Sequence, residues 1–152
     1  MKKSVKKQTI INVYPMLNDA SLGKMEVTDR FVFIKALRPL KKIYTEYNDF
    51  REDAVNRLKP ENYEKIVENV QKFNQLNQEE REDALKDKEI TDALQANGEF
   101  NLNIEMCFRD ELAKEIELEI APLSEDAFGK LMDSNQQWNA GQIIELQDLL
   151  CE

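Results

Sequence analysis

The sequence predicts a mainly α-helical fold: a long kinked helix packed in a helical hairpin, a short extended or β segment near residues 116–121, and two short C-terminal helices. Three observations predict this fold. The 152 residues include only four glycines and four prolines, too few for the many turns of a β-sandwich. Apolar residues recur at spacings of three and four from Phe33 to Leu58. Helix-capping residues precede two apolar stretches near the C-terminus.

The long helix has the strongest pattern. Thr28 can cap it, and Asp29 suits the positive end of its dipole. Pro39 lies inside the stripe and predicts a kink near residues 35–39. The helix should end before Pro60, because a residue that precedes proline disfavours helical angles. The apolar positions of the stripe are Phe33, Leu37, Leu40, Tyr44, Tyr47, Ala54 and Leu58.

Two neighbouring segments also have helical patterns. Residues 8–22 allow a helix, which Pro15 would break or kink. A second helix is expected to start at Pro60 and, because the link is short, to form an antiparallel hairpin with the long one. Its predicted buried face consists of Tyr63, Ile66, Val67, Val70 and Phe73. The polar residues 77–95 are typical of a solvated helix or a mobile connection.

Residues 99–117 fit both a helix and a strand, and the continuing period of 3.6 residues favours the helix. Apolar and mostly acidic residues then alternate up to Pro122, which predicts a short strand. A lone strand needs a partner. Either a second strand lies in residues 8–14 or 101–107, or the segment is merely extended.

The C-terminal part predicts two short helices. Ser124 caps the first, which presents apolar side chains inward and stops at the polar residues 133–135. Asn139 and Gln142 resemble a capping box that opens the last, leucine-rich helix.

Charge is unevenly distributed along the chain. Residues 1–7 hold four lysines and no acid, and they predict a basic flexible tail before a single helical domain over residues 8–152. That domain carries 17 basic and 30 acidic groups, a net charge of −13. It would repel nucleic acid and anionic lipid, so neither nucleic acid nor a membrane is expected as a partner.

The residues needed for common chemistries are missing or isolated. Without histidine, the usual triads and zinc or di-iron ligand sets cannot form. Cys107 and Cys151 share no motif, and a packed, free thiol in a reducing, intracellular setting is expected for each. We therefore predict no catalytic residue, no cofactor and no metal site. An enzyme that uses carboxylates alone is a remaining alternative.

A group of aromatic residues follows the long helix: Phe31, Phe33, Tyr44, Tyr47 and Phe50. They are interpreted either as core residues packed against a partner helix or as an exposed interaction stripe. Apolar residues stand on more than one face of this helix, and the second face must be covered by something, for example another subunit.

The stretch FIKALRPLKKIYTEYNDFREDAV, followed by IELEIAPLSEDAFGKLMDSN and AGQIIELQDLLCE, carries a family resemblance. The pattern, over residues 10–150, resembles a family of small proteins of unknown function that are encoded by tailed phages and prophages. The resemblance supplies no catalytic residues. It implies a phage or mobile-element origin, and with it a role in virion assembly or in host interaction.

These observations predict a non-enzymatic protein-interaction or assembly component that self-associates, in the host cytoplasm or in a virion. The alternative is an acidic mimic of nucleic acid that inhibits a host DNA-binding protein. The net charge of −13 motivates that alternative, but ordinary acidic solubility explains the charge equally well.

Overall fold

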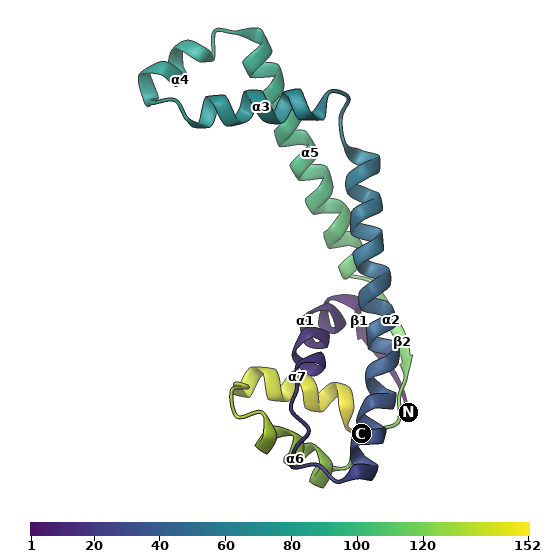
Figure 1. The fold of residues 1–152 in the computed structure, drawn as a ribbon. Coiled ribbons are helices and arrows are strands. Elements are labelled where there is room, and N and C mark those ends of the chain that lie inside the picture. Colours follow the sequence, from purple (N-terminus) through teal and green to yellow (C-terminus); the bar gives the residue numbers. More distant parts are fainter. The chain divides into compact units, whose positions relative to one another are not determined.

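A computed structural model describes all 152 residues and confirms the mainly helical fold with its long helix, short β segment and C-terminal helices (Figure 1). The elements in chain order are β1 (Lys2–Lys6), α1 (Lys7–Asn18), α2 (Val27–Leu58), α3 (Tyr63–Asn74), α4 (Gln78–Ala84), α5 (Lys88–Leu112), β2 (Glu115–Glu119), α6 (Glu125–Ser134) and α7 (Ala140–Leu150). The chain divides into two compact units: unit 1 is Met1–Asp49 with Glu111–Glu152, and unit 2 is Phe50–Asp110.

The sheet of unit 1 corrects two expectations. Residues 2–6, predicted as part of a flexible tail, form β1, which pairs antiparallel with β2 from Lys2↔Glu119 to Lys6↔Glu115. The partner of the predicted strand therefore lies in neither residues 8–14 nor 101–107. Opposite charges face each other at both ends of the ladder, which favours this pairing.

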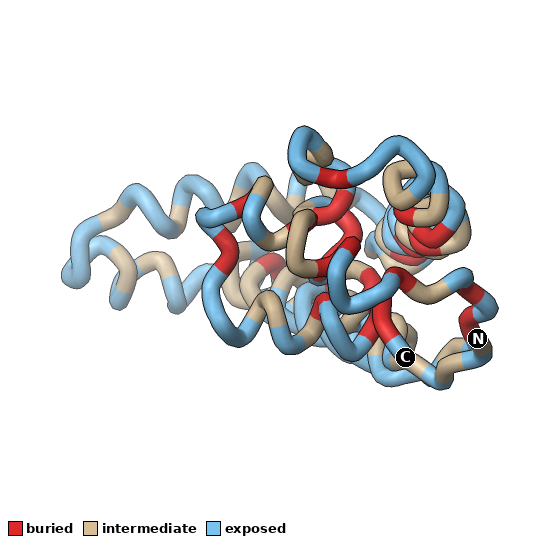
Figure 2. The backbone as a smooth tube through the Cα atoms, turned by 90° about the horizontal axis from the view of Figure 1, so that it is seen from below, coloured by how far each residue is buried: buried red, intermediate tan, exposed pale blue.

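The core of unit 1 combines residues from both ends of the chain. Most of the residues coloured as buried in Figure 2 belong to this core, on the side of the molecule where the two termini are labelled. Its largest fully buried apolar side chains are Ile10, Val13, Leu17, Leu40, Leu131, Leu146, Leu149 and Leu150. The helix α1 continues through Pro15 to Asn18, and α2 begins at Val27 rather than after Thr28.

Local capping signals position the C-terminal helices as predicted. The Ser124 hydroxyl accepts a hydrogen bond from the Ala127 backbone N–H at 3.1 Å. The Asn139 and Gln142 side chains form a reciprocal capping box. At the end of α6, the buried Asn135 accepts from the Ser21 N–H at 2.8 Å and donates to the Ser21 carbonyl at 2.9 Å. This side chain thereby ties the loop before α2 to α6.

Unit 2 consists of the end of α2 with α3, α4 and most of α5. Of the ambiguous residues 99–117, those up to Leu112 are helical, as the 3.6-residue period predicts, whereas residues 115–117 belong to β2 of unit 1. The helix α3 begins at Tyr63, not at Pro60, because Asn62 takes a left-handed conformation with φ of 56°. No residue of α3 is fully buried, so its predicted buried face is only half covered.

Contacts within unit 2 centre on α5. The rings of Tyr63 and Phe100 lie 5.1 Å apart, and the Arg51 guanidinium stands 5.3 Å from the centre of the Phe108 ring. The helix α5 thus contacts both α3 and the end of α2. Across the whole chain, none of the helices combines the length and the apolar composition of a membrane-spanning segment.

Candidate interaction surface

The structure separates the five aromatic residues that the sequence grouped together. Phe33 and Tyr47 are buried, with 2% and 5% of their surface exposed. The Tyr44 ring packs 4.8 Å from that of Tyr14, and Phe50 is half-buried. Phe31 alone is exposed, at 62%. Residues 31 and 33 point to nearly opposite sides of a helix, because each residue turns it by about 100°.

Phe31 instead belongs to an exposed apolar row at the start of α2. Val27, Phe31 and Ile34 follow one another at spacings of four and three, which place them on one face. Their exposed fractions are 63%, 62% and 40%. The opposite face carries Phe33 and Leu40, which are buried in the core of unit 1. The helix therefore cannot rotate to cover this row without exposing its core face.

Basic side chains continue the same face. Arg38 and Lys41 extend the row at spacings of four and three, and Lys35 stands beside it; all three are exposed. None of the three forms an ion pair within the chain, although the chain has nine more acidic than basic groups. By contrast, Lys42 lies 3.9 Å from Glu46. We call Val27, Phe31, Ile34, Arg38 and Lys41 the docking stripe.

Hydrogen bonds hold the start of the docking stripe in place. The Arg30 side chain donates from Nε to the Met25 carbonyl at 2.9 Å and from a terminal nitrogen to the Gly23 carbonyl at 3.2 Å. Met25 itself is buried in the core. The segment that leads into α2 is thus fastened on both sides, and the stripe is presented by a rigid element.

Unit 2 has its own exposed apolar pair. Leu102 and Met106 stand one helical turn apart on α5, with 56% and 50% of their surface exposed. The buried side chains of unit 2 are limited to Ala54, Ala93 and Phe100. Two alanines and one aromatic ring make a thin core for a unit of this length.

The titratable groups with perturbed pKa values act within the fold. Glu111 lies 2.7 Å from the Lys114 ammonium and 2.6 Å from that of Lys7. The hydrogen bonds from Lys114 and then from Lys7 lower the pKa of the Glu111 carboxyl, so it stays ionised as the centre of an ion triad. Burial raises the pKa of the Cys151 thiol, which keeps it protonated and unreactive.

No group of three or more acidic or thiol side chains is arranged so that it could hold a metal ion. The predictions of no catalytic, cofactor-binding or metal-binding residue stay predictions. What the site residues do provide is a fixed, exposed face that is apolar at one end and cationic at the other.

Comparisons with protein families, with curated proteins and with solved structures found no match for this chain. The resemblance to a phage-encoded family therefore stays a prediction.

Proposed function

We propose that this chain is a non-enzymatic protein-interaction component, and that its docking stripe binds a partner protein. The observation that carries the proposal is the exposure of three large apolar side chains in one row, Val27, Phe31 and Ile34. Single exposed apolar residues are common on protein surfaces, but a contiguous row marks a site of interaction.

The charge of the docking stripe indicates what the partner presents. Arg38 and Lys41 have no acidic neighbour within hydrogen-bonding distance in this chain, so their charges are free to meet carboxylates on another surface. The docking stripe has an apolar half, Val27 to Ile34, and a cationic half, Arg38 and Lys41. A partner that offers apolar side chains opposite Phe31 and carboxylates one to two helical turns further along would match both halves. Burial of one large apolar side chain is worth about 1.5–3 kcal/mol, so the apolar half supplies affinity and the cationic half supplies orientation.

The proposal is tested by site-specific photo-crosslinking in the cells from which the sequence comes. A photoreactive phenylalanine analogue at position 31 should give one dominant crosslinked protein. The matched control places the same analogue at Lys24, an exposed position outside the docking stripe, where that product should be absent. The double substitution Arg38→Glu/Lys41→Glu should suppress the crosslink at position 31. Equal products from both positions would refute the proposal.

Folding of the variants is a necessary control. Because Phe31 and Ile34 are exposed, Phe31→Ser/Ile34→Ser should change the free energy of unfolding by less than about 0.5 kcal/mol for each substitution. Loss of the crosslink in such a folded variant then reports on binding alone.

Self-association is part of the same proposal and has its own test. The mass in solution should rise with protein concentration, and a strict monomer that also gives no crosslink would count against an interaction function. A role in a phage particle or in host interaction rests on the family resemblance, and the identity of the neighbouring genes is its test.

A further inference from the structure

The strand β1 has a free edge whose backbone groups can be identified. Met1 and Ile120 exchange backbone hydrogen bonds at 3.0 and 3.1 Å, and the Lys7 N–H donates to the Lys114 carbonyl at 2.9 Å. In an antiparallel ladder the direction of the backbone groups alternates along the strand. Lys3 and Val5 therefore bond to β2, whereas the backbone N–H and C=O of Ser4 point to the opposite edge. The sheet holds two strands alone, so this edge has no strand on it.

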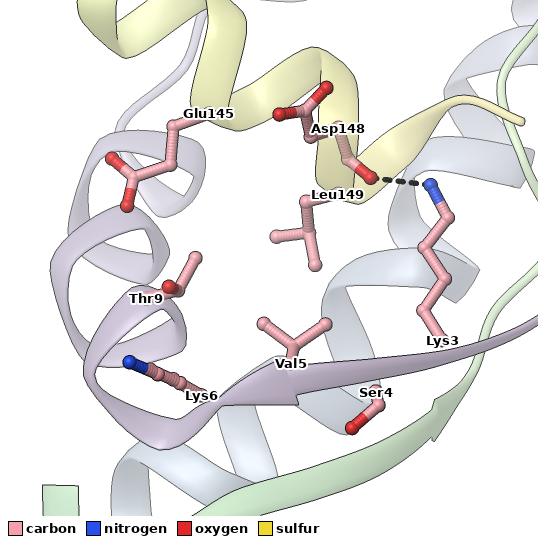
Figure 3. A pocket seen from close by; sticks show the side chains of 8 residues that line it. All are labelled: Lys3, Ser4, Val5, Lys6, Thr9, Glu145, Asp148 and Leu149. Carbon is pink, nitrogen blue, oxygen red and sulfur yellow. Dashed lines mark hydrogen bonds between the residues drawn. The ribbon is translucent and has the colours of Figure 1, made fainter. Parts of the chain in front are cut away.

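A groove of about 420 Å³ runs along that edge (Figure 3). Four consecutive residues of β1, Lys3 to Lys6, line one wall, together with Thr9 at the start of α1. Successive side chains of a strand point to opposite faces, so a cavity that touches four in a row lies beside the edge rather than over one face. The other wall belongs to α7: Glu145, Asp148 and Leu149.

The two walls are held apart at a fixed spacing. The Lys3 ammonium reaches from β1 to α7 and donates to the backbone carbonyls of Asp148 and Cys151. Val5 points across the groove toward Leu149 (Figure 3). Val5 and Leu149 thus form the apolar part of the groove, and Glu145 and Asp148 place carboxylates beside them on the α7 wall. Lys3 closes one end, so the groove exists before any ligand arrives.

The charges of β1 select what can lie beside it. Lys2 and Lys6 are exposed on one face of the sheet, opposite Glu119 and Glu115 of β2. The side chains of a third strand on the free edge would alternate between the two faces of the sheet. Those in the first position would lie next to Lys2 and Lys6, and those in the second position would lie on the face of Val5. Acidic residues suit the first position and apolar residues the second. A second copy of β1 would set lysine against lysine, which opposes pairing of the β1 edges of two copies.

We propose that the free edge of β1 is a second docking site, which takes an extended segment of another protein with alternating acidic and apolar residues as a third strand. The segment would accept hydrogen bonds from the backbone N–H groups of Ser4 and Lys6 and donate one to the Ser4 carbonyl. The site is independent of the docking stripe on α2, since no residue is shared between them.

The probe is a blocked peptide, EIELEI, which has the sequence of residues 115–120 and therefore the required alternation of acidic and apolar residues. It should bind with a dissociation constant at least about tenfold lower than that of the charge-reversed peptide KIKLKI or of EEEIIL, which has the same composition without alternation. Equal binding of all three peptides, or of none, would overturn the proposal.

Two variants localise the binding. Ser4→Pro removes the N–H that points to the free edge, together with the exposed 3.2 Å hydrogen bond from the Ser4 hydroxyl to the Glu115 carboxylate. It leaves the backbone hydrogen bonds to β2 intact, because proline is tolerated at an edge strand when its nitrogen faces away from the ladder. Its melting temperature should stay within about 4 °C of the parent while EIELEI binding is lost. The matched variant Ser4→Thr, which keeps the N–H, should bind like the parent. Peptide binding by a folded Ser4→Pro would refute the proposal.

Amide hydrogen exchange on the parent protein gives a second readout that does not depend on a variant. Without peptide, the Ser4 and Lys6 amides should exchange fast while those of Lys3 and Val5 are protected. Saturating EIELEI should slow Ser4 and Lys6 at least about tenfold and leave Lys3 and Val5 protected. Loss of protection at Val5 would mean that the peptide replaces β2, and protection that grows with protein concentration alone would identify a second copy as the occupant. Either result overturns the proposal.

Discussion

Unit 1 and unit 2 are stabilised in different ways. Unit 1 encloses a core of nineteen buried residues drawn from β2, from four helices and from the segments that connect them. The buried residues of unit 2 are only Ala54, Ala93 and Phe100. Unit 2 relies instead on half-buried side chains and on surface pairs such as Lys65–Glu89 at 3.3 Å. A thin core lowers the free energy of local opening, so the two units should respond differently to the same kind of perturbation.

The largest expected effect is a cavity in the core of unit 1. Leu146 is completely buried on α7, and Leu146→Ala should lower the free energy of unfolding by about 3 kcal/mol, measured by urea denaturation. The matched control is Leu102→Ala in unit 2, where 56% of the leucine is exposed. It should cost less than about 0.5 kcal/mol. Equal losses at the two positions would abolish the contrast between the units.

A smaller and local effect is expected from the single large buried side chain of unit 2. Phe100→Ala removes the ring that meets Tyr63 at 5.1 Å. It should lower the local opening energy of α3 and α5 by about 2 kcal/mol, less than in a dense core because the thinly packed unit 2 can collapse around the gap. Hydrogen exchange should then accelerate across residues 63–100 while the amides of unit 1 keep their rates. A uniform acceleration of both units would show that they open together.

The smallest effect concerns pH and salt. The lysines lower the pKa of Glu111 from its ordinary value of 4.5. Its contribution to stability is therefore present above that value and is lost as the pH falls through the folded pKa. The Glu111 side chain is only 13% exposed, so Glu111→Gln should cost about 1 kcal/mol at pH 7, and the difference from the parent should disappear in acid.

Glu89 of unit 2 is the exposed counterpart against which the effect of Glu111→Gln can be compared. Its pKa is also lowered, chiefly by the hydrogen bond from Lys65, but its side chain is 58% exposed. Exposed pairs are screened by salt. The effect of Glu89→Gln should accordingly be smaller than that of Glu111→Gln and should vanish at about 0.5 M NaCl, where the Glu111 effect persists. Equal salt sensitivity would contradict the difference in burial.

Signals that act over a few residues made much of the fold predictable. Ser124 and Asn139 reveal two helix starts, since a capping side chain reaches only three residues along the chain. The long series of apolar residues at spacings of three and four likewise reveals the helix α2. The pairing of β1 with β2 was missed because more than a hundred residues separate the strands and because Lys2, Lys3 and Lys6 make β1 look like a solvated tail. The complementary alternation of lysine and glutamate was the available signal.

Only the apolar part of the candidate site could be predicted from the sequence. The sequence predicts apolar residues on more than one face of the long helix, with Phe31 among them, but its aromatic character groups Phe31 with Phe33 and Tyr47, which are buried. Grouping by helical face would have joined Phe31 to Val27 and Ile34 instead. The unpaired state of Arg38 and Lys41 depends on where distant acids lie in space, which no local pattern encodes.

The placement of β1 and β2 also has a consequence for how the protein is made. Residues of β1 leave the ribosome long before those of β2, and everything in unit 2 is synthesised between them. At the usual speed of translation, roughly 5–20 residues per second, the first strand waits for several seconds without its partner. During that wait its lysines, which discourage contact with other strand edges, protect the nascent chain from wrong association.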